Sequence, residues 1–175
     1  MRNRCSSLFV ALVAIAVVAL GADISADYDH KTDFSQFHTY SWIGVKAGDQ
    51  LWQDRIMSAV DNQLAAKGSS KVASGGDASV SAFGRTREQD TLQTFYEGLP
   101  GWGWYGFGGE GMSTTYSEPT RVGSVTVDIF SGSTRHLIWR GRAEDVLSPK
   151  PEKNEKKLDK SITDMFKKFP PNQKG

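Results

Sequence analysis

The fold of this chain is decided by residues 121–144, RVGSVTVDIFSGSTRHLIWRGRAE. In the first half of this stretch Val125, Val127 and Ile129 alternate with polar residues, and a second apolar run follows the turn-like residues 131–133. Successive side chains of a strand point to opposite faces, so two such runs around a short glycine and serine segment are typical of a β-hairpin with one buried face. We therefore predict an antiparallel pair of strands at this position.

An amphipathic helix follows the hairpin. After Pro149 and Pro151, apolar residues recur at helical spacing until Pro170 and Pro171, where a helix cannot continue. The charged residues between them fall on the other side and indicate a solvated face. We expect the apolar stripe to cover the sheet, although such a stripe can also dock a partner helix. Its members are Leu158, Ile162, Met165, Phe166 and Phe169.

Upstream of the hairpin the sequence predicts three strands and another helix. Residues 24–29 and 39–43 read as strands, and the polar residues 33–36 connect them. Asp49 can cap a helix over residues 50–67, and Gly68 follows its end. Residues 78–83 form a weaker third strand. Core packing is expected for Trp42, Trp52 and Trp139, which lie in elements with apolar periodicity.

This order of elements predicts the fold class. The class is α+β: an antiparallel β-sheet with two amphipathic helices packed on one face, and a long loop rich in glycine and aromatic residues.

The N-terminal segment is typical of a secretory signal peptide. Arg2 and Arg4 precede an apolar run at residues 8–20, and small residues follow at 21 and 22. This run is shorter than the roughly 20 residues that span a bilayer. We therefore predict a signal peptide at residues 1–22 and a single exported α+β domain, periplasmic or secreted, at residues 23–175. The only cysteine, Cys5, precedes the apolar run, so the position that accepts lipid in bacterial lipoproteins holds no cysteine.

Composition excludes several classes of function. Removal of residues 1–22 leaves 21 − 2 = 19 basic residues against 20 acidic ones. This balance does not recommend a nucleic-acid partner, whose phosphates require a concentrated basic surface. The exported domain would contain no thiol, which excludes disulfides, thiolate metal sites and cysteine nucleophiles. We expect a monomer with no cofactor and no transmembrane span in the mature chain.

Eight short motifs, read in order, resemble a bacterial exported family known as domain of unknown function 4136. The resemblance implies an envelope or secreted setting and an α+β domain, and it brings no established activity or catalytic residues. Members are often lipoproteins, whereas this chain lacks the lipid-acceptor cysteine, and residues 85–119 depart from the family pattern. The motifs are ADYD at 26–29, TDFSQF at 32–37, TYSW at 39–42, LAAKG at 64–68, VTVDIF at 125–130, IWRG at 138–141, PEKN at 151–154 and FKKFPP at 166–171.

Residues 98–111 are the unusual part of the sequence. They place Trp102, Trp104, Tyr105 and Phe107 among many glycines, where neither helical nor strand periodicity holds. We predict that these four rings, in a loop over residues 98–116, bind a partner by stacking. The alternative is that the glycines let the loop fold back and bury the rings over the sheet edge, since exposed rings cost about 25 cal/mol per Å².

The same segment contains a spacing found in dinucleotide sites. Gly101, Gly103 and Gly106 match G-x-G-x-x-G, a pattern that lets backbone approach a pyrophosphate at the start of a helix. Here no helix follows, and bulky aromatic residues stand between the glycines. We therefore interpret the match as coincidental.

Metal-binding and catalytic groups are sparse. Strand alternation puts Asp27 and Asp29 on one face and His30 on the other, which argues against a metal site. No serine lies in a G-x-S-x-G motif, and the chain has only three histidines as neutral-pH bases. Asp128 and Arg140 lie on the paired strands, where we predict a structural ion pair. The remaining candidates considered for metal binding or base catalysis are Asp33, His38 and His136.

The function that these observations favour is binding. We predict an exported, non-catalytic binding or accessory module that contacts an envelope protein, a glycan or a lipid through the loop at residues 98–116. Two alternatives stay open: an envelope hydrolase with acidic catalytic residues, and a purely structural envelope component. An enzyme predicts a cleft where acidic groups or a histidine converge, and a structural component predicts buried loop rings.

Overall fold

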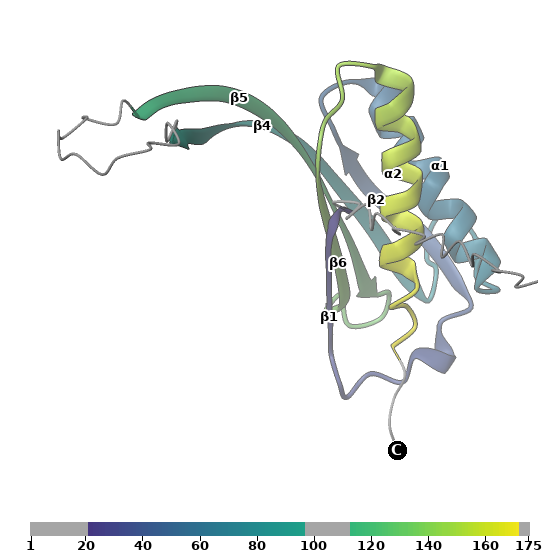
Figure 1. The fold of residues 1–175 in the computed structure, drawn as a ribbon. Helices are drawn as coiled ribbons and strands as arrows, with labels where there is room; N and C mark the ends of the chain where they lie inside the picture. The colour runs from purple at the N-terminus through teal and green to yellow at the C-terminus, as the bar shows by residue number, and fades with distance from the viewer. Residues whose placement is uncertain (1–20, 97–112, 172–175) are drawn as a thin grey trace, which may run out of the picture.

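The computed structural model describes residues 21–96 and 113–171, which form one mixed sheet with two helices on one of its faces (Figure 1). This arrangement confirms the α+β class. The elements are β1 (Asp23–Tyr28), the 3-10 turn η1 (Phe34–Gln36), β2 (Thr39–Lys46), α1 (Gln50–Ala66), β3 (Ser70–Lys71), β4 (Ala78–Tyr96), β5 (Ser113–Ser131), β6 (Leu137–Val146) and α2 (Pro151–Phe166).

The sheet is not wholly antiparallel. Its strand order is β1-β6-β5-β4-β2-β3, and β2 runs parallel to both β3 and β4. The expectation of an antiparallel sheet is wrong at this side because α1 carries the chain back along the sheet before β4 begins. A strand that follows such a crossover runs in the direction of the strand before it. The predicted hairpin, by contrast, is confirmed as β5 and β6.

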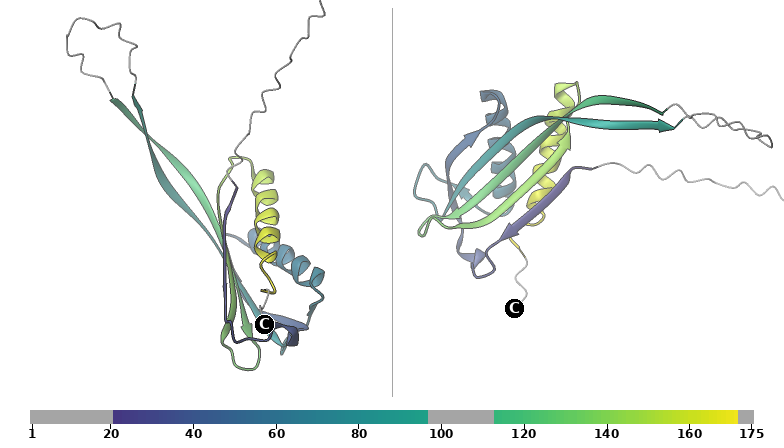
Figure 2. Two further views of the ribbon diagram at one scale, coloured as in Figure 1. Left: turned by 60° about the horizontal axis from the view of Figure 1, so that its bottom comes forward. Right: turned by 90° about the vertical axis from the view of Figure 1, so that its left-hand side faces the viewer.

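Local signals in the sequence set both helices. The Asp49 side chain caps α1 by accepting a hydrogen bond of 2.9 Å from the backbone N–H of Trp52. Gly68 follows the helix with a positive φ of 85°, where a residue without a side chain is favoured. Pro151 occupies the first turn of α2, where its missing N–H costs no helical hydrogen bond. Both helices cover the same face of the sheet (Figure 2).

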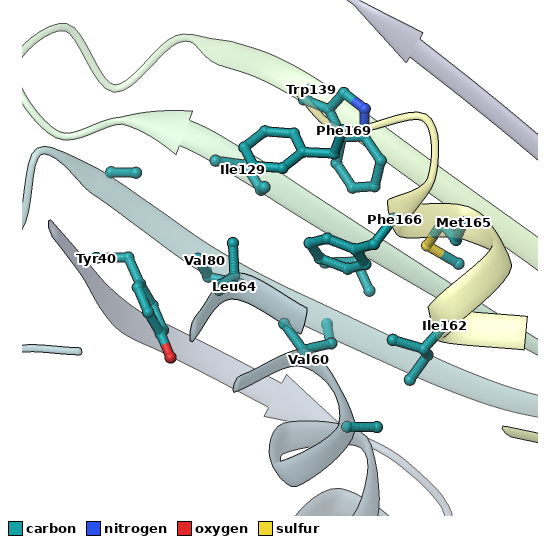
Figure 3. Packing of buried hydrophobic residues seen from close by; sticks show 14 of the residues in the cluster. Tyr40, Val60, Leu64, Val80, Ile129, Trp139, Ile162, Met165, Phe166 and Phe169 are labelled. Carbon is teal, nitrogen blue, oxygen red and sulfur yellow. The ribbon is translucent and has the colours of Figure 1, made fainter. Parts of the chain in front are cut away.

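The core lies between this face and the helices (Figure 3). Trp139 of β6 is fully buried, and its ring centre lies 5.3 Å from that of Phe166 in α2 and 5.3 Å from that of Phe169. Burial of each such side chain stabilises the fold by about 1.5–3 kcal/mol. The apolar stripe predicted for the last helix therefore covers the sheet. Trp42 packs against the cluster, whereas Trp52 lies outside it and stacks with Arg55.

A hydrogen-bond network joins α1 to β2 and β3 at the edge of the core. One carboxylate oxygen of Asp61 accepts hydrogen bonds of 2.8 Å from the Tyr40 hydroxyl and from Nε1 of Trp42. The other oxygen accepts from Nζ of Lys71 at 2.8 Å. Burial of the Tyr40 ring, and then its hydrogen bond to Asp61, raise the pKa of this phenol above its ordinary value. The network fixes α1 on the parallel part of the sheet.

Candidate functional site

Strands β4 and β5 continue far beyond the rest of the sheet. The pairing of β2 with β4 ends at Phe83, and the pairing of β6 with β5 ends at Val122. Nine further pairs join β4 to β5, from Glu88 with Arg121 to Tyr96 with Ser113. We call residues 88–96 and 113–121 the ribbon. At about 3.4 Å per residue it is about 30 Å long, and it projects away from the helices (Figures 1 and 2).

The ribbon changes the boundaries predicted for this part of the chain. The third strand, expected at residues 78–83, continues to Tyr96, and the last four residues of the expected loop, 113–116, belong to β5. Tyr96 and Ser113 are paired at the far end of the ribbon, and residues 97–112 connect them in the sequence. The predicted binding residues Trp102, Trp104, Tyr105 and Phe107, and the glycine spacing around them, lie outside the described residues.

The acidic residues near the first strand serve local turns. Asp29 accepts hydrogen bonds from the backbone N–H of Lys31 and the Thr32 hydroxyl, and Asp33 accepts from Ser35 in η1. These hydrogen bonds are the main cause of the lowered pKa of both carboxyl groups. In the described part of the chain no three histidine, cysteine, aspartate or glutamate residues gather as a metal site.

A further carboxylate, Asp77, joins two strands next to His38. His38 donates its backbone N–H to Asp77, whose Oδ2 also accepts from the backbone and hydroxyl of Thr39. The hydrogen bonds from Thr39 and His38 lower the pKa of Asp77, so this carboxylate acts as a joint between the start of β2 and the start of β4. His136 is exposed just before β6.

The predicted ion pair between β5 and β6 is present. Both carboxylate oxygens of Asp128 accept hydrogen bonds from the Arg140 guanidinium, at 2.6 Å from Nε and 2.7 Å from the second nitrogen. The pair lies on the sheet face opposite the helices, which we call the open face. Glu144, on the same face, pairs with Arg87 at 3.1 Å and with Arg142.

The open face contains a shallow depression of about 650 Å³ across β2, β4, β5 and β6. Small side chains form the bottom of the depression, and most of the charged side chains that line it are cationic. Its lining consists of Gly44, Lys46, Ser81, Ala82, Phe83, Arg85, Ser124, Thr126, Asp128, Arg140 and Arg142.

Two cations of this depression have no carboxylate partner in the part of the chain that the structure describes. Among the described residues, no ion pair involves Lys46 or Arg85, whereas Arg140 and Arg142 are paired with acids. The Arg85 guanidinium lies 4.5 Å from the ring centre of Phe83, a side chain that is 37% exposed. Sequence reasoning missed this group because Lys46 lies 37 residues from Phe83 in the chain and only the register of β2 with β4 pairs them.

A second hollow, of about 510 Å³, lies at the end of the open face. Ser41, Phe130 and Arg135 line it, together with residues 73–76. Gly76 passes so close to β2 that an added Cβ would lie 2.7 Å from the Cα of Tyr40. This position therefore requires glycine, and the hollow is bounded by closely packed backbone.

Residues 24–171 match the family model of a domain of unknown function, DUF4136. The chain belongs to this family. The DUF4136 match begins in β1 and continues past the end of α2, so it includes the ribbon strands and the open face. The resemblance inferred from the eight short motifs is thereby confirmed.

Solved structures share the fold of this DUF4136 domain at low sequence identity. A PDZ domain protein from Parabacteroides distasonis is 12% identical with a TM-score of 0.59, and the match covers 89% of this chain and 37% of that one. The chain thus corresponds to just over a third of that protein. A PelC dodecamer from Paraburkholderia phytofirmans is 12% identical with a TM-score of 0.51, covering 83% of this chain and 94% of PelC. No curated protein matches the sequence.

None of the described helices is long and apolar enough to cross a bilayer.

Proposed function

We propose that this chain is an exported, non-catalytic binding or accessory module of the cell envelope, directed there by a signal peptide at residues 1–22. Its contact residues are Trp102, Trp104, Tyr105 and Phe107. The observation that supports this proposal is the ribbon: β4 and β5 extend about 30 Å past their neighbours in the sheet, and the aromatic segment connects their far ends.

The ribbon is better explained as a segment that contacts a partner than as one that stabilises the domain. Two strands without neighbours or a covering helix are marginally stable on their own. Among the residues of β4 and β5 whose burial is described, those that join the core cluster lie between positions 78 and 82 and between 125 and 129, outside the ribbon. A long extension beyond the part of the sheet that β2 and β6 pair with is expected to serve a contact beyond the domain.

The first test is binding to isolated bacterial envelopes, which contain protein, glycan and lipid together. The variant W102A/W104A is expected to reduce the fraction that sediments with envelopes at least tenfold, without a change in the unfolding midpoint. A matched control, I43A/L51A, removes two apolar side chains that are 62% and 58% exposed and should bind as the wild type does. Protease treatment or lipid extraction of the envelopes then distinguishes the three partner classes.

Two results would overturn this proposal. One is equal sedimentation of the wild type and W102A/W104A. The other is a large loss of stability in that variant together with weak acrylamide quenching of wild-type tryptophan fluorescence, which would mean that the rings are part of a core.

A second candidate function is a structural envelope component that assembles with copies of itself. It is favoured by the ribbon, with which no further strand pairs among the described residues, and by the fold shared with the PelC dodecamer. Unpaired strand edges are templates for pairing with another chain. Sedimentation velocity decides between this candidate and the monomer expected from the sequence, because an assembly predicts a species of several chain masses that dissociates on dilution.

A further inference from the structure

We infer that the depression on the open face binds an acidic oligosaccharide, with Lys46 and Arg85 as the residues that take its carboxylate groups. This site is separate from the aromatic segment of residues 97–112 and goes beyond the function proposed above. The inference is carried by the two cations that lack carboxylate partners among the described residues, by the hydroxyl groups beside them and by the partly exposed ring of Phe83.

The charge of the open face is unevenly distributed. Among the residues whose side chains are described, its acids are Asp23, Asp27, Asp128 and Glu144, which lie on β1, β5 and β6. On the side of β2 and β4, the depression contains Lys46 and Arg85, and no acid of β2 or β4 lines it. A carboxylate entering there meets two cations that no acid among the described residues neutralises. The other two arginines of the lining pair with Asp128 and Glu144, so the uncompensated positive charge of the depression lies on Lys46 and Arg85.

The guanidinium of Arg85 contacts a neighbouring ring. It lies over the Phe83 ring at 4.5 Å, a cation–π contact that restricts the side chain. A donor that is held in place loses less conformational entropy when a ligand binds. Guanidinium groups also match the geometry of carboxylates by donating two parallel hydrogen bonds.

The sheet register extends the site into a row. Lys46 is opposite Phe83, Phe83 is opposite Thr126, and Thr126 is opposite Arg142. Because neighbouring strands lie about 4.8 Å apart, this row is about 15 Å long. It places the unpaired Lys46 at one end and Arg142, which is paired with Glu144, at the other, with a ring and a hydroxyl between them. A chain of sugars with repeated carboxylates fits this row better than a single small anion.

The small side chains of the depression favour a sugar over a lipid surface. Ser81, Ser124 and Thr126 provide hydroxyl groups that can donate and accept hydrogen bonds with sugar hydroxyls. Phe83 offers one partly exposed ring for stacking on the apolar side of a sugar. Membrane-surface binding instead requires a broad apolar face beside the cations.

Calorimetric titration with oligogalacturonate tests this site, with a neutral maltooligosaccharide of equal length as the comparison ligand. We expect binding of the acidic oligomer that weakens as NaCl is raised, because exposed charges are screened by salt. The variant K46A/R85A should bind at least tenfold more weakly. The control K153A/K156A removes the same charge from exposed positions of α2 and should bind as the wild type does.

Three outcomes of the same titration would overturn the inference. These are no binding of the acidic oligomer, equal binding of the neutral one, or equal losses in K46A/R85A and K153A/K156A. Preferential binding to phosphatidylglycerol vesicles without oligomer binding would also overturn it. The variant W102A/W104A should retain oligogalacturonate binding, and K46A/R85A should retain envelope sedimentation through the aromatic residues, so the two proposals can fail separately.

Discussion

The two faces of this sheet are built from the same strands, but one is apolar and buried by the helices and the other is polar and exposed. On β6, Trp139 is fully buried against α2, whereas the next residue, Arg140, has a side chain that is 52% exposed on the open face. On β5, Ile129 is in the core and Asp128 pairs with that arginine. Antiparallel sheets commonly pack one face and solvate the other. The difference teaches that stability depends on the helix-covered face, which leaves the open face available for polar contacts with a ligand.

The largest effect is predicted for a comparison of two phenylalanines, one packed against the helix-covered face and one on the open face. F166A is expected to lower the free energy of unfolding by about 3–5 kcal/mol, because the fully buried ring leaves a cavity beside Trp139. F83A on the open face should cost less than about 1 kcal/mol, because its ring is already 37% exposed. Urea unfolding of both variants measures the difference. Similar losses would mean that the two faces contribute alike to stability.

The next prediction concerns Gly76, at the end of the open face, where backbone packs closely against β2. In G76A the new Cβ would lie 2.7 Å and 2.9 Å from backbone atoms of Tyr40 and Ser41, which cannot move without displacing β2. We expect a loss of about 1–3 kcal/mol. G44A is the matched control, since nothing lies within 4 Å of its added Cβ. Thermal unfolding that ranks G44A as the more damaging change would contradict this account.

Much of the helix-covered face could be predicted from the sequence. Alternation in residues 125–129 and helical spacing after Pro151 are local patterns, and each reports directly which side chains are buried. The ribbon was missed because residues 84–96 show no apolar alternation, the pattern from which a strand is predicted. The parallel position of β2 beside β4 was missed because the sequence shows a strand, a helix and a strand without showing which neighbours the last strand takes.

The candidate site on the open face was harder to predict from the sequence. The pair Asp128 and Arg140 was predicted because both residues lie in one hairpin, whose turn fixes the register. Lys46 and Phe83 come from strands separated by α1, and a bulge between Trp42 and Gly44 shifts the pairing between them. A residue count along β2 cannot reveal this shift, so only the folded register brings the depression together.

A smaller effect tests the polar edge of the covered face through its pH dependence. Burial and the hydrogen bond to Asp61 raise the pKa of Tyr40, so the folded state keeps its phenol protonated at a pH where the unfolded state ionises. The stabilising contribution is complete below the unfolded pKa of about 10 and declines as pH rises above it. In Y40F the unfolding free energy should be about 1–2 kcal/mol lower at pH 7, and its decline between pH 9 and 11 should be shallower. Parallel curves for the wild type and Y40F would contradict a raised pKa.

The smallest effect belongs to the ion pair on the open face. A double-mutant cycle with D128N and R140Q is expected to give a coupling energy of about 0.2–1 kcal/mol, although both hydrogen bonds are short, because the Arg140 side chain is half exposed. The coupling should shrink further at 1 M NaCl. The single variant D128N also tests ligand binding. It removes one negative charge from the depression, so oligogalacturonate binding should become tighter while stability changes little.

A coupling energy of several kcal/mol in the double-mutant cycle would contradict this account. It would mean that ion pairs on the open face stabilise the sheet, and that the cations there have a structural role.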